Sequence, residues 1–191
     1  MAKGNKPQVG ILAEDNDLVS FCLKIVMKLG IQTIRKKINI EVVPPEGAGF
    51  TFVHRQYPKL VKRHRARATK TSVLFVIGID SDKKTFAGRS NELDGKLESN
   101  DLPKRDDAEP IVLVIPKRNI ETWVEYFTRS VETRESVDEE TDYKRRHKKP
   151  DIETAANGFV AEYRQWKSDA ASVKTLNALI QTYKELNRVV G

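Results

Sequence analysis

Two carboxylates, one residue apart, follow an apolar stretch of this sequence. Residues 73–79 read VLFVIGI, and they end in Asp80 and Asp82. Residues i and i+2 of an extended segment point to the same side, about 6.6 Å apart along the chain. Two like charges so placed repel each other unless a positive group lies between them. The pair therefore predicts a bound cation, and the usual one is a metal ion.

A third acid, Glu14, closes an earlier apolar run at 9–15, VGILAED. In an open parallel sheet, side chains at the carboxyl ends of the strands converge where the strand order reverses. If the two strands are neighbours, Glu14 faces Asp80 and Asp82 across that crevice. Mg²⁺ takes oxygen ligands and would offset the repulsion, and one or two such ions can activate a water and stabilise the leaving oxygen of a phosphodiester.

The elements that position these acids alternate between strands and helices. Apolar or β-branched runs predict four strands, at 9–15, 38–44, 73–79 and 111–116. Helical patterns predict helices between and after them, at 18–29, 57–70, 87–99 and 118–127. This alternation indicates an α/β fold, in which a four-stranded parallel sheet is covered by helices on both faces.

Composition divides the chain into three regions. Residues 1–130 form the predicted α/β domain. Residues 131–151 are almost wholly charged, which favours a linker or mobile loop. In 152–191, apolar residues recur at helical spacing and predict a helical hairpin, with its second helix at 173–190. We expect this tail to pack on the sheet domain or on a partner.

The bulk numbers describe an ordinary soluble protein. The chain has 191 residues, a hydrophobic fraction of 39% and a formal net charge of +7, which favours an anionic partner such as nucleic acid. The single cysteine, Cys22, excludes an intrachain disulfide and a cysteine-based zinc site. No apolar run has the length of a secretion signal or a membrane span, so we expect a cytoplasmic protein without a membrane partner.

The order of these motifs resembles the Toprim (topoisomerase–primase) domain. The resemblance rests on Glu14 in ILAEDNDL, on the glycine-containing segment EGAGF at 46–50, and on the acids of GIDSDKKTFAG. A further segment at 115–127, IPKRNIETWVEYF, is similar to the stretch after the fourth strand of OLD-type and related phage-defence nucleases. The resemblance implies a Mg²⁺- or Mn²⁺-dependent nuclease that hydrolyses DNA or RNA.

The resemblance covers about residues 8–130 and assigns roles by position. It implies four metal ligands: Glu14, Asp80, Asp82 and Glu121. It also implies that Glu14 acts as a general acid or base. Two cations after the fourth strand would stabilise charge on the phosphate being cleaved: Lys117 and Arg118.

Two basic runs are candidates for nucleic-acid binding. The predicted helix at 57–70 carries six cations and no acid: Lys59, Lys62, Arg63, Arg65, Arg67 and Lys70. Such a run is often a solvated face, but unbroken positive charge along one element is also the pattern expected of phosphate binding. The KRRHKK run at 144–149 would contact phosphate or, with its acidic neighbours, form a self-neutralising linker.

Each acid also has an ordinary structural explanation. Glu14 stands beside a predicted helix start, where acids favour the helix dipole. Asp80 and Asp82 suit a turn or a helix cap. Glu121 lies in a predicted first helical turn, where acids are common, after Asn119 as a good cap.

Two other functions remain open. VGILAEDNDLV also looks like the opening of a two-component receiver domain. In that interpretation Asp80 would accept a phosphoryl group, and Lys117 would correspond to the receiver's lysine. Alternatively, the chain is a non-catalytic scaffold or nucleic-acid-binding subunit. Because it lacks a GxxxxGK[ST] phosphate-binding loop, a defence complex would need a separate ATPase subunit, and the apolar tail would dock that subunit or a second copy of the chain.

Overall fold

The computed structural model describes residues 8–30, 39–43, 49–67 and 73–190. Most of the predicted EGAGF loop and Lys70 of the basic run lie outside these ranges. Within them, no helix combines the length and the apolar character needed to cross a membrane.

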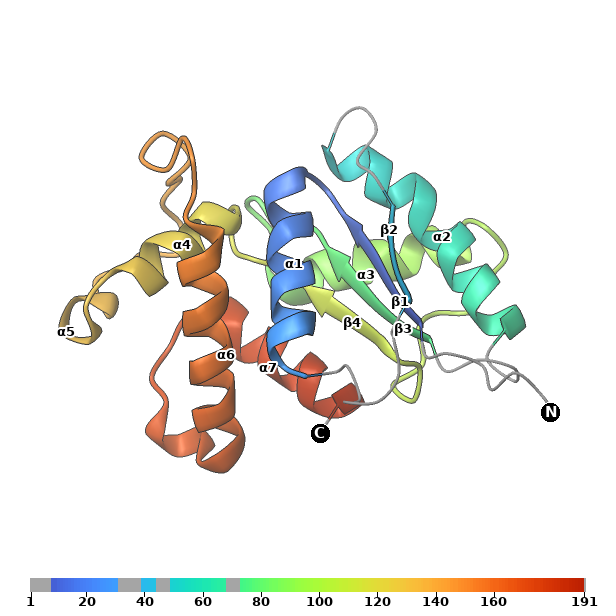
Figure 1. The fold of residues 1–191 in the computed structure, drawn as a ribbon. Coiled ribbons are helices and arrows are strands. Elements are labelled where there is room, and N and C mark those ends of the chain that lie inside the picture. Colours follow the sequence, from blue (N-terminus) through green and yellow to red (C-terminus); the bar gives the residue numbers. More distant parts are fainter. Residues whose placement is uncertain (1–7, 31–38, 44–48, 68–72, 191) are drawn as a thin grey trace.

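The described strands form one parallel sheet in the order β2-β1-β3-β4 (Figure 1). Its strands are β1 (Gln8–Ala13), β2 (Asn39–Val43), β3 (Val73–Gly78) and β4 (Ile111–Val114). The helices are α1 (Asn16–Lys28), α2 (Gly49–Arg67), α3 (Phe86–Glu98), α4 (Ile120–Thr128), α5 (Val131–Arg134), α6 (Ile152–Ser168) and α7 (Asn177–Val190), with a short 3-10 helix at Ala170–Ser172. The predicted α/β class with a parallel sheet is confirmed.

Both faces of the sheet are buried, because side chains on each strand alternate between two hydrophobic layers. In β3, Leu74 and Val76 pack with α1, α4, α6 and α7, whereas Phe75 and Ile77 pack with α2 and α3. The helices therefore cover opposite faces of the sheet, as Figure 1 shows.

The element bounds differ from the predicted ones where local chemistry is ambiguous. Helix α2 begins at Gly49 and continues through Pro58, although the sequence predicted a helix only from Tyr57. Proline inside a helix removes one backbone hydrogen bond, so its position favoured a start near residue 57. Burial of Phe52, Val53 and Tyr57 against the sheet offsets that loss.

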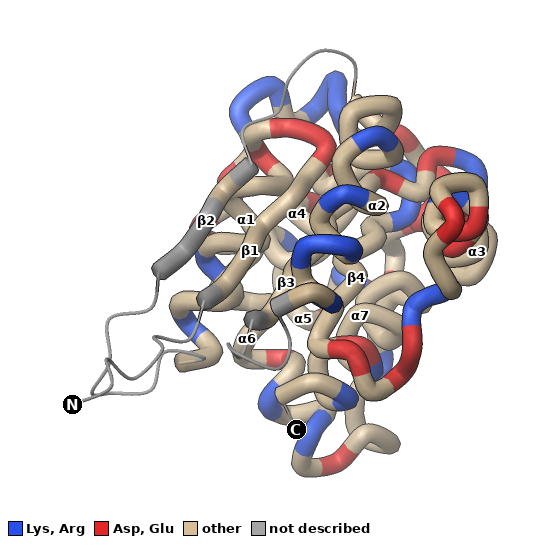
Figure 2. Tube along the Cα trace, turned by 90° about the vertical axis from the view of Figure 1, so that its right-hand side faces the viewer, with Lys and Arg blue, Asp and Glu red and all other residues tan. Residues whose placement is uncertain are grey.

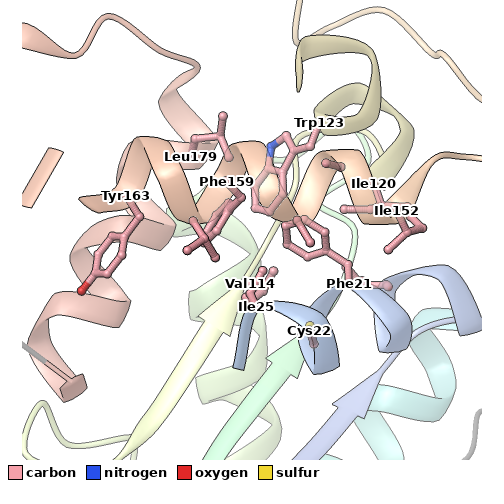
Figure 3. Packing of buried hydrophobic residues seen from close by; sticks show 14 of the residues in the cluster. Phe21, Cys22, Ile25, Val114, Ile120, Trp123, Ile152, Phe159, Tyr163 and Leu179 are labelled. Carbon is pink, nitrogen blue, oxygen red and sulfur yellow. The ribbon is translucent and has the colours of Figure 1, made fainter. Parts of the chain in front are cut away.

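The C-terminal helices belong to the same hydrophobic core as the sheet. Phe21 of α1, Trp123 of α4 and Phe159 of α6 pack together, with ring centroids 5.3 to 5.8 Å apart (Figure 3). On α7, Glu185 accepts a hydrogen bond from the backbone of Leu113 in β4, at 3.3 Å. The predicted tail thus packs on the sheet domain.

The charged segment between α4 and α6 is also packed against the protein. After α5 its backbone is irregular up to α6, but Val137 and Tyr143 are buried in the same core as α4. The expectation of a linker or mobile loop at 131–151 followed from its charge, and these two apolar anchors correct it.

Two helical glycines give opposite predictions. A Cβ added at Gly158 of α6 would lie 2.4 Å from Phe127 Cδ1, whereas one added at Gly95 of α3 would meet no atom within 4 Å. Gly158→Ala is expected to lower the free energy of unfolding by about 1–3 kcal/mol through overpacking. Gly95→Ala is expected to raise it by about 0.5–1 kcal/mol, because alanine favours the helix.

Urea denaturation of both variants checks this pair. If Gly158→Ala stabilised the protein as much as Gly95→Ala, then α6 would not approach α4 as closely as described.

Candidate functional site

The site lies where the strand order of the sheet reverses, between β1 and β3. β1 pairs with both β2 and β3, and the helices that follow β1 and β2 cover opposite faces, so the carboxyl ends of β1 and β3 border a crevice. Glu14 follows β1, and its backbone N–H donates to Gly78 O at 3.1 Å. Its carboxylate accepts a hydrogen bond from the Asp80 backbone N–H at 3.1 Å. The structure thus brings Glu14 and Asp80 together.

Asp82 does not share the position of Asp80, which corrects the expectation from spacing. β3 ends at Gly78, so the i, i+2 rule of an extended strand no longer applies at residue 82. Asp82 has a φ of 52°, and its backbone forms an isolated bridge with Arg118. Its side chain is 61% exposed and pairs with Arg89 at 2.9 Å. A guanidinium therefore pairs with this carboxylate, which still lies close enough to Glu14 to raise the pKa of that residue.

Glu121 approaches the same crevice from α4. It lies in the first turn of α4 and is 8% exposed, and its Oε2 has no hydrogen-bond partner within the described residues. Asp80 is 2% exposed, and its Oδ1 likewise has no partner there. Leaving a buried polar atom unpaired costs about 1–3 kcal/mol, so each of these oxygens could gain from a further partner.

The buried acids form one electrostatic cluster. Burial raises the pKa of Asp80 well above its usual value, and repulsion by Glu14, Asp15 and Glu121 raises it further. Burial likewise raises the pKa values of Glu14 and Glu121. Asp15 has a structural role in addition, because its carboxylate caps α1 by accepting from the backbone N–H of Leu18 at 2.8 Å.

Lys144 supplies the positive charge of this cluster. Its Nζ lies 3.8 Å from Asp80 Oδ2. Burial opposes protonation of Lys144, but Asp80, Glu121, Asp15 and Glu14 outweigh it and raise the pKa of the ammonium. Sequence reasoning missed this residue because it belongs to the segment expected to be a linker. The only signal was the basic run in which Lys144 stands.

Three contacts hold the Lys144 segment against α4 and the residues before it. The Asn119 amide donates to Asp142 at 2.9 Å, and Lys117 pairs with Glu140 at 2.8 Å. The third contact is centred on Glu125, which pairs with Arg129 and Arg146 and forms a hydrogen bond with His147. Burial opposes ionisation of Glu125, but the hydrogen bonds from these three side chains outweigh it and lower its pKa.

Glu125→Gln is expected to weaken the attachment of this segment. The variant keeps an acceptor but loses the charge, so we expect the free energy of unfolding at pH 7 to fall by about 2 kcal/mol. Because the folded pKa of Glu125 is lowered, the difference from wild type should be complete above the unfolded pKa of about 4.3. It should then disappear as the pH falls through the folded pKa.

Chemical denaturation across this pH range measures the difference. Glu135→Gln is the matched control, because Glu135 is an exposed acid just after α5. Equal effects of the two substitutions, or a difference that is independent of pH, would contradict the role given to Glu125.

Lys144→Met removes the cation from the acidic cluster. In buffer with EDTA, we expect the variant to lose up to about 1 kcal/mol of stability, since half-exposed ion pairs contribute little. Added Mn²⁺ should raise the melting temperature more than it does in wild type, because the ion no longer competes with an ammonium. Lys148→Met, at an exposed lysine of the same run, is the control. An unchanged response to Mn²⁺ would contradict this expectation.

The remaining predicted cations are divided between the site and a distant surface. Lys117 donates to the backbone oxygen of Lys84 at 3.0 Å in addition to its pair with Glu140, so its ammonium is held beside the site. Arg118 has a φ of 64° and lines a pocket that also includes Lys144. Both follow β4, as the sequence predicted.

The basic part of α2 lies farther from the acids. Lys59 and Lys62 are exposed, but Arg65 pairs with Glu109 at 2.6 Å. The N-terminal end of α2 is the end near Glu14. A Cβ added at Gly49 would lie 2.8 Å from Glu14 Oε1. At 1.5 Å per residue, Lys59 is about 15 Å farther along the helix. Figure 2 shows the blue basic positions along α2.

The carboxylates of the site provide oxygen ligands for a hard cation, but they do not form a closed coordination shell. Within the described ranges, no three His, Cys, Asp or Glu side chains are grouped so that they could hold a metal ion. The available donors are nevertheless carboxylate oxygens, the ligands that Mg²⁺ and Mn²⁺ prefer. Two of them, Asp80 Oδ1 and Glu121 Oε2, are buried without a hydrogen-bond partner among the described residues, and Asp80 Oδ2 lies near the Lys144 ammonium. The chemistry of the donor set therefore fits a divalent cation.

Comparison with protein-family models, with curated proteins and with solved structures found no match to this chain.

Proposed function

We propose that this protein is a Mg²⁺- or Mn²⁺-dependent nuclease with a Toprim-like α/β domain, which hydrolyses phosphodiester bonds of DNA or RNA. The observation that supports it best is the pair of buried carboxylates Asp80 and Glu121, which repel each other and each keep one oxygen without a hydrogen-bond partner among the described residues. Perturbed carboxylates grouped in a crevice are typical of catalytic sites.

Each residue of the site has a separate role in this proposal. Asp80 and Glu121 would hold the ion, which supplies a water nucleophile active at neutral pH and stabilises negative charge on oxygen. Glu14, whose pKa burial raises, would accept and return the proton, because a raised pKa makes its carboxylate a stronger base. The Lys144 ammonium would stabilise the charge that develops on the phosphate. Asp82 instead positions Arg89.

The surface charge is suited to a polyanionic substrate. The exposed cations of α2, Lys59 and Lys62, would contact phosphates several nucleotides away from the cleaved bond. We further propose that the protein acts in the cytoplasm, as the effector of a phage-defence complex in which a separate ATPase subunit or further copies of the chain take part.

The geometry does not favour the receiver alternative. A phosphoacceptor must be open to its phosphodonor, yet Asp80 is only 2% exposed. Lys117, the lysine that a receiver would direct at the phosphoryl group, is engaged by Glu140 and by the backbone of Lys84.

A cleavage assay tests the proposal. The protein is incubated with plasmid, single-stranded DNA and RNA in Mn²⁺ or Mg²⁺, in EDTA, and separately with acetyl phosphate. We expect cleavage of at least one nucleic acid that stops in EDTA. Cleavage that persists in EDTA, phosphorylation of Asp80, or nucleic-acid binding without any cleavage would each contradict it.

A further inference from the structure

A pocket of about 590 Å³ opens beside the acidic cluster. Its wall includes Lys144 from the cluster, Lys83 and Arg118 from the ends of neighbouring strands, and Phe50 and Arg89 from α2 and α3. This volume lies within the range of about 300–1,000 Å³ that is usual for small-ligand sites in proteins. Five cations and three carboxylates line the pocket, so it is positive overall.

Two of these cations are available to a ligand. Lys83 is exposed, and Arg118 is partly exposed on a residue with positive φ. Within the described part of the chain, neither side chain makes a hydrogen bond or an ion pair, although Arg118 is close enough to Asp142 to help lower the pKa of that carboxyl. Arg89, in contrast, is 3% exposed and is held by Asp82 and Glu92, so it forms part of the wall.

Phe50 gives the pocket an aromatic surface. It stands in the first turn of α2 and is 47% exposed, one of the few large apolar side chains so exposed among the described residues. The Arg89 guanidinium lies 5.9 Å from the ring centroid, and the His54 ring lies at 5.4 Å in an edge contact. The ring therefore has neighbours inside the pocket and keeps nearly half of its surface open to a ligand.

We propose that this pocket binds one unpaired nucleotide of a nucleic-acid strand, with its base against Phe50 and its phosphate between Lys83 and Arg118. An exposed aromatic ring in a cationic groove is the combination by which proteins bind single-stranded nucleic acids. A base inside a duplex is covered on both faces by its neighbours and cannot stack on the ring. The inference rests on the proposed nuclease function, whose substrate class it specifies.

The position of the pocket relates this nucleotide to the cleaved bond. Lys144 belongs both to the pocket wall and to the acidic cluster, where its Nζ lies 3.8 Å from Asp80. The bound nucleotide is therefore adjacent to the site of hydrolysis. The preferred substrates are single strands or unpaired ends.

Binding measured without cleavage tests the proposal. A short fluorescent single-stranded oligonucleotide and the matching duplex are titrated in EDTA by anisotropy. The test variants are Phe50→Ala, Phe50→Trp and Arg118→Gln. Lys167→Gln, at an exposed lysine in the last turn of α6, removes the same kind of charge outside the pocket. Melting temperatures show that each variant is folded.

We expect Phe50→Ala to weaken single-strand binding by about 5- to 100-fold, the usual effect of losing one stacked base, and to leave duplex binding unchanged. Phe50→Trp should keep the affinity of the wild type, and Arg118→Gln should weaken binding more than Lys167→Gln. Single-strand binding that is equal in Phe50→Ala and wild type would overturn the proposal.

The result is separable from that of the cleavage assay. If the protein cleaves no nucleic acid, yet its single-strand binding depends on Phe50, the proposed nuclease function is refuted and the proposed nucleotide site is supported. If the protein cleaves nucleic acid and its single-strand binding is independent of Phe50, the proposed nuclease function is supported and the proposed nucleotide site is refuted.

Discussion

Asp80→Asn is expected to lower the rate of metal-dependent cleavage by at least about 1,000-fold, or about 4 kcal/mol of transition-state stabilisation. Asp80 is the most buried acid of the cluster, and its Oδ1 is unpartnered within the described residues. An amide keeps the shape of the side chain but cannot supply the negative charge that a divalent cation requires. Initial rates in Mn²⁺ measure the loss.

The same substitution is expected to stabilise the protein in the absence of metal. Burial and three neighbouring acids disfavour the charged form of Asp80, so its removal should raise the free energy of unfolding in EDTA by about 1–2 kcal/mol. A loss of activity together with a gain in stability distinguishes a functional carboxylate from a structural one.

Asp107→Asn is the matched control for Asp80→Asn. Asp107 is exposed in the loop before β4, at the opposite edge of the sheet. This variant should change neither rate nor stability. An Asp80→Asn protein that still cleaves at the wild-type rate would refute the assignment, and one that is both inactive and unfolded would show that Asp80 holds the fold together.

Trp123→Ala is expected to lower the free energy of unfolding by about 3–5 kcal/mol, the largest stability effect that we predict. The indole is fully buried between Phe21 and Phe159, and so connects α4 to α1 and α6 (Figure 3). Its removal leaves a cavity at the centre of this layer. Because Glu121 lies on the same helix, the cluster of acids should also lose its geometry.

Trp166→Ala is the comparison for Trp123→Ala. Trp166 is only partly buried near the end of α6, where it stacks on Tyr163 at 6.3 Å. We expect about 1–2 kcal/mol for its loss, as fewer contacts disappear. Urea denaturation measures both variants. A cost for Trp123→Ala no larger than that for Trp166→Ala would mean that the C-terminal helices do not share the core of the sheet domain.

The sequence predicted the meeting of Glu14 and Asp80 on the condition that the first and third strands are neighbours, and β1 does pair with β3. Each follows an apolar run whose period and length identify a strand, and in a parallel sheet the carboxyl ends of strands lie at one edge. The family resemblance, and not this rule, assigned Lys117 and Arg118, which follow β4. For Glu14 and Asp80 the chemistry depends on which strands are adjacent and little on side-chain detail.

The position of the Asp82 side chain could not be predicted in the same way. Spacing alone cannot indicate that β3 ends at Gly78, or that residue 82 adopts a left-handed backbone that directs it to Arg89. A strand end is set by the partner strand and by the loop that follows, and both are tertiary features.

Lys144 could not be predicted for a different reason. Composition correctly describes 131–151 as highly charged, but charge alone does not show which of its cations meets a buried acid 64 residues earlier in the chain. Two apolar residues, Val137 and Tyr143, anchor the segment, and among so many charges they give no periodic signal. The site thus depends on a contact between residues distant in sequence, Lys144 and Asp80, which local sequence patterns do not predict.

The most direct test of the account is the position of a metal ion. Crystals grown without metal are soaked in Mn²⁺, and its anomalous scattering is recorded. We expect a peak contacted by the carboxylates of Asp80 and Glu121, with the Lys144 ammonium displaced from Asp80. A crevice without such a peak, in which Lys144 keeps its contact with Asp80, would contradict it.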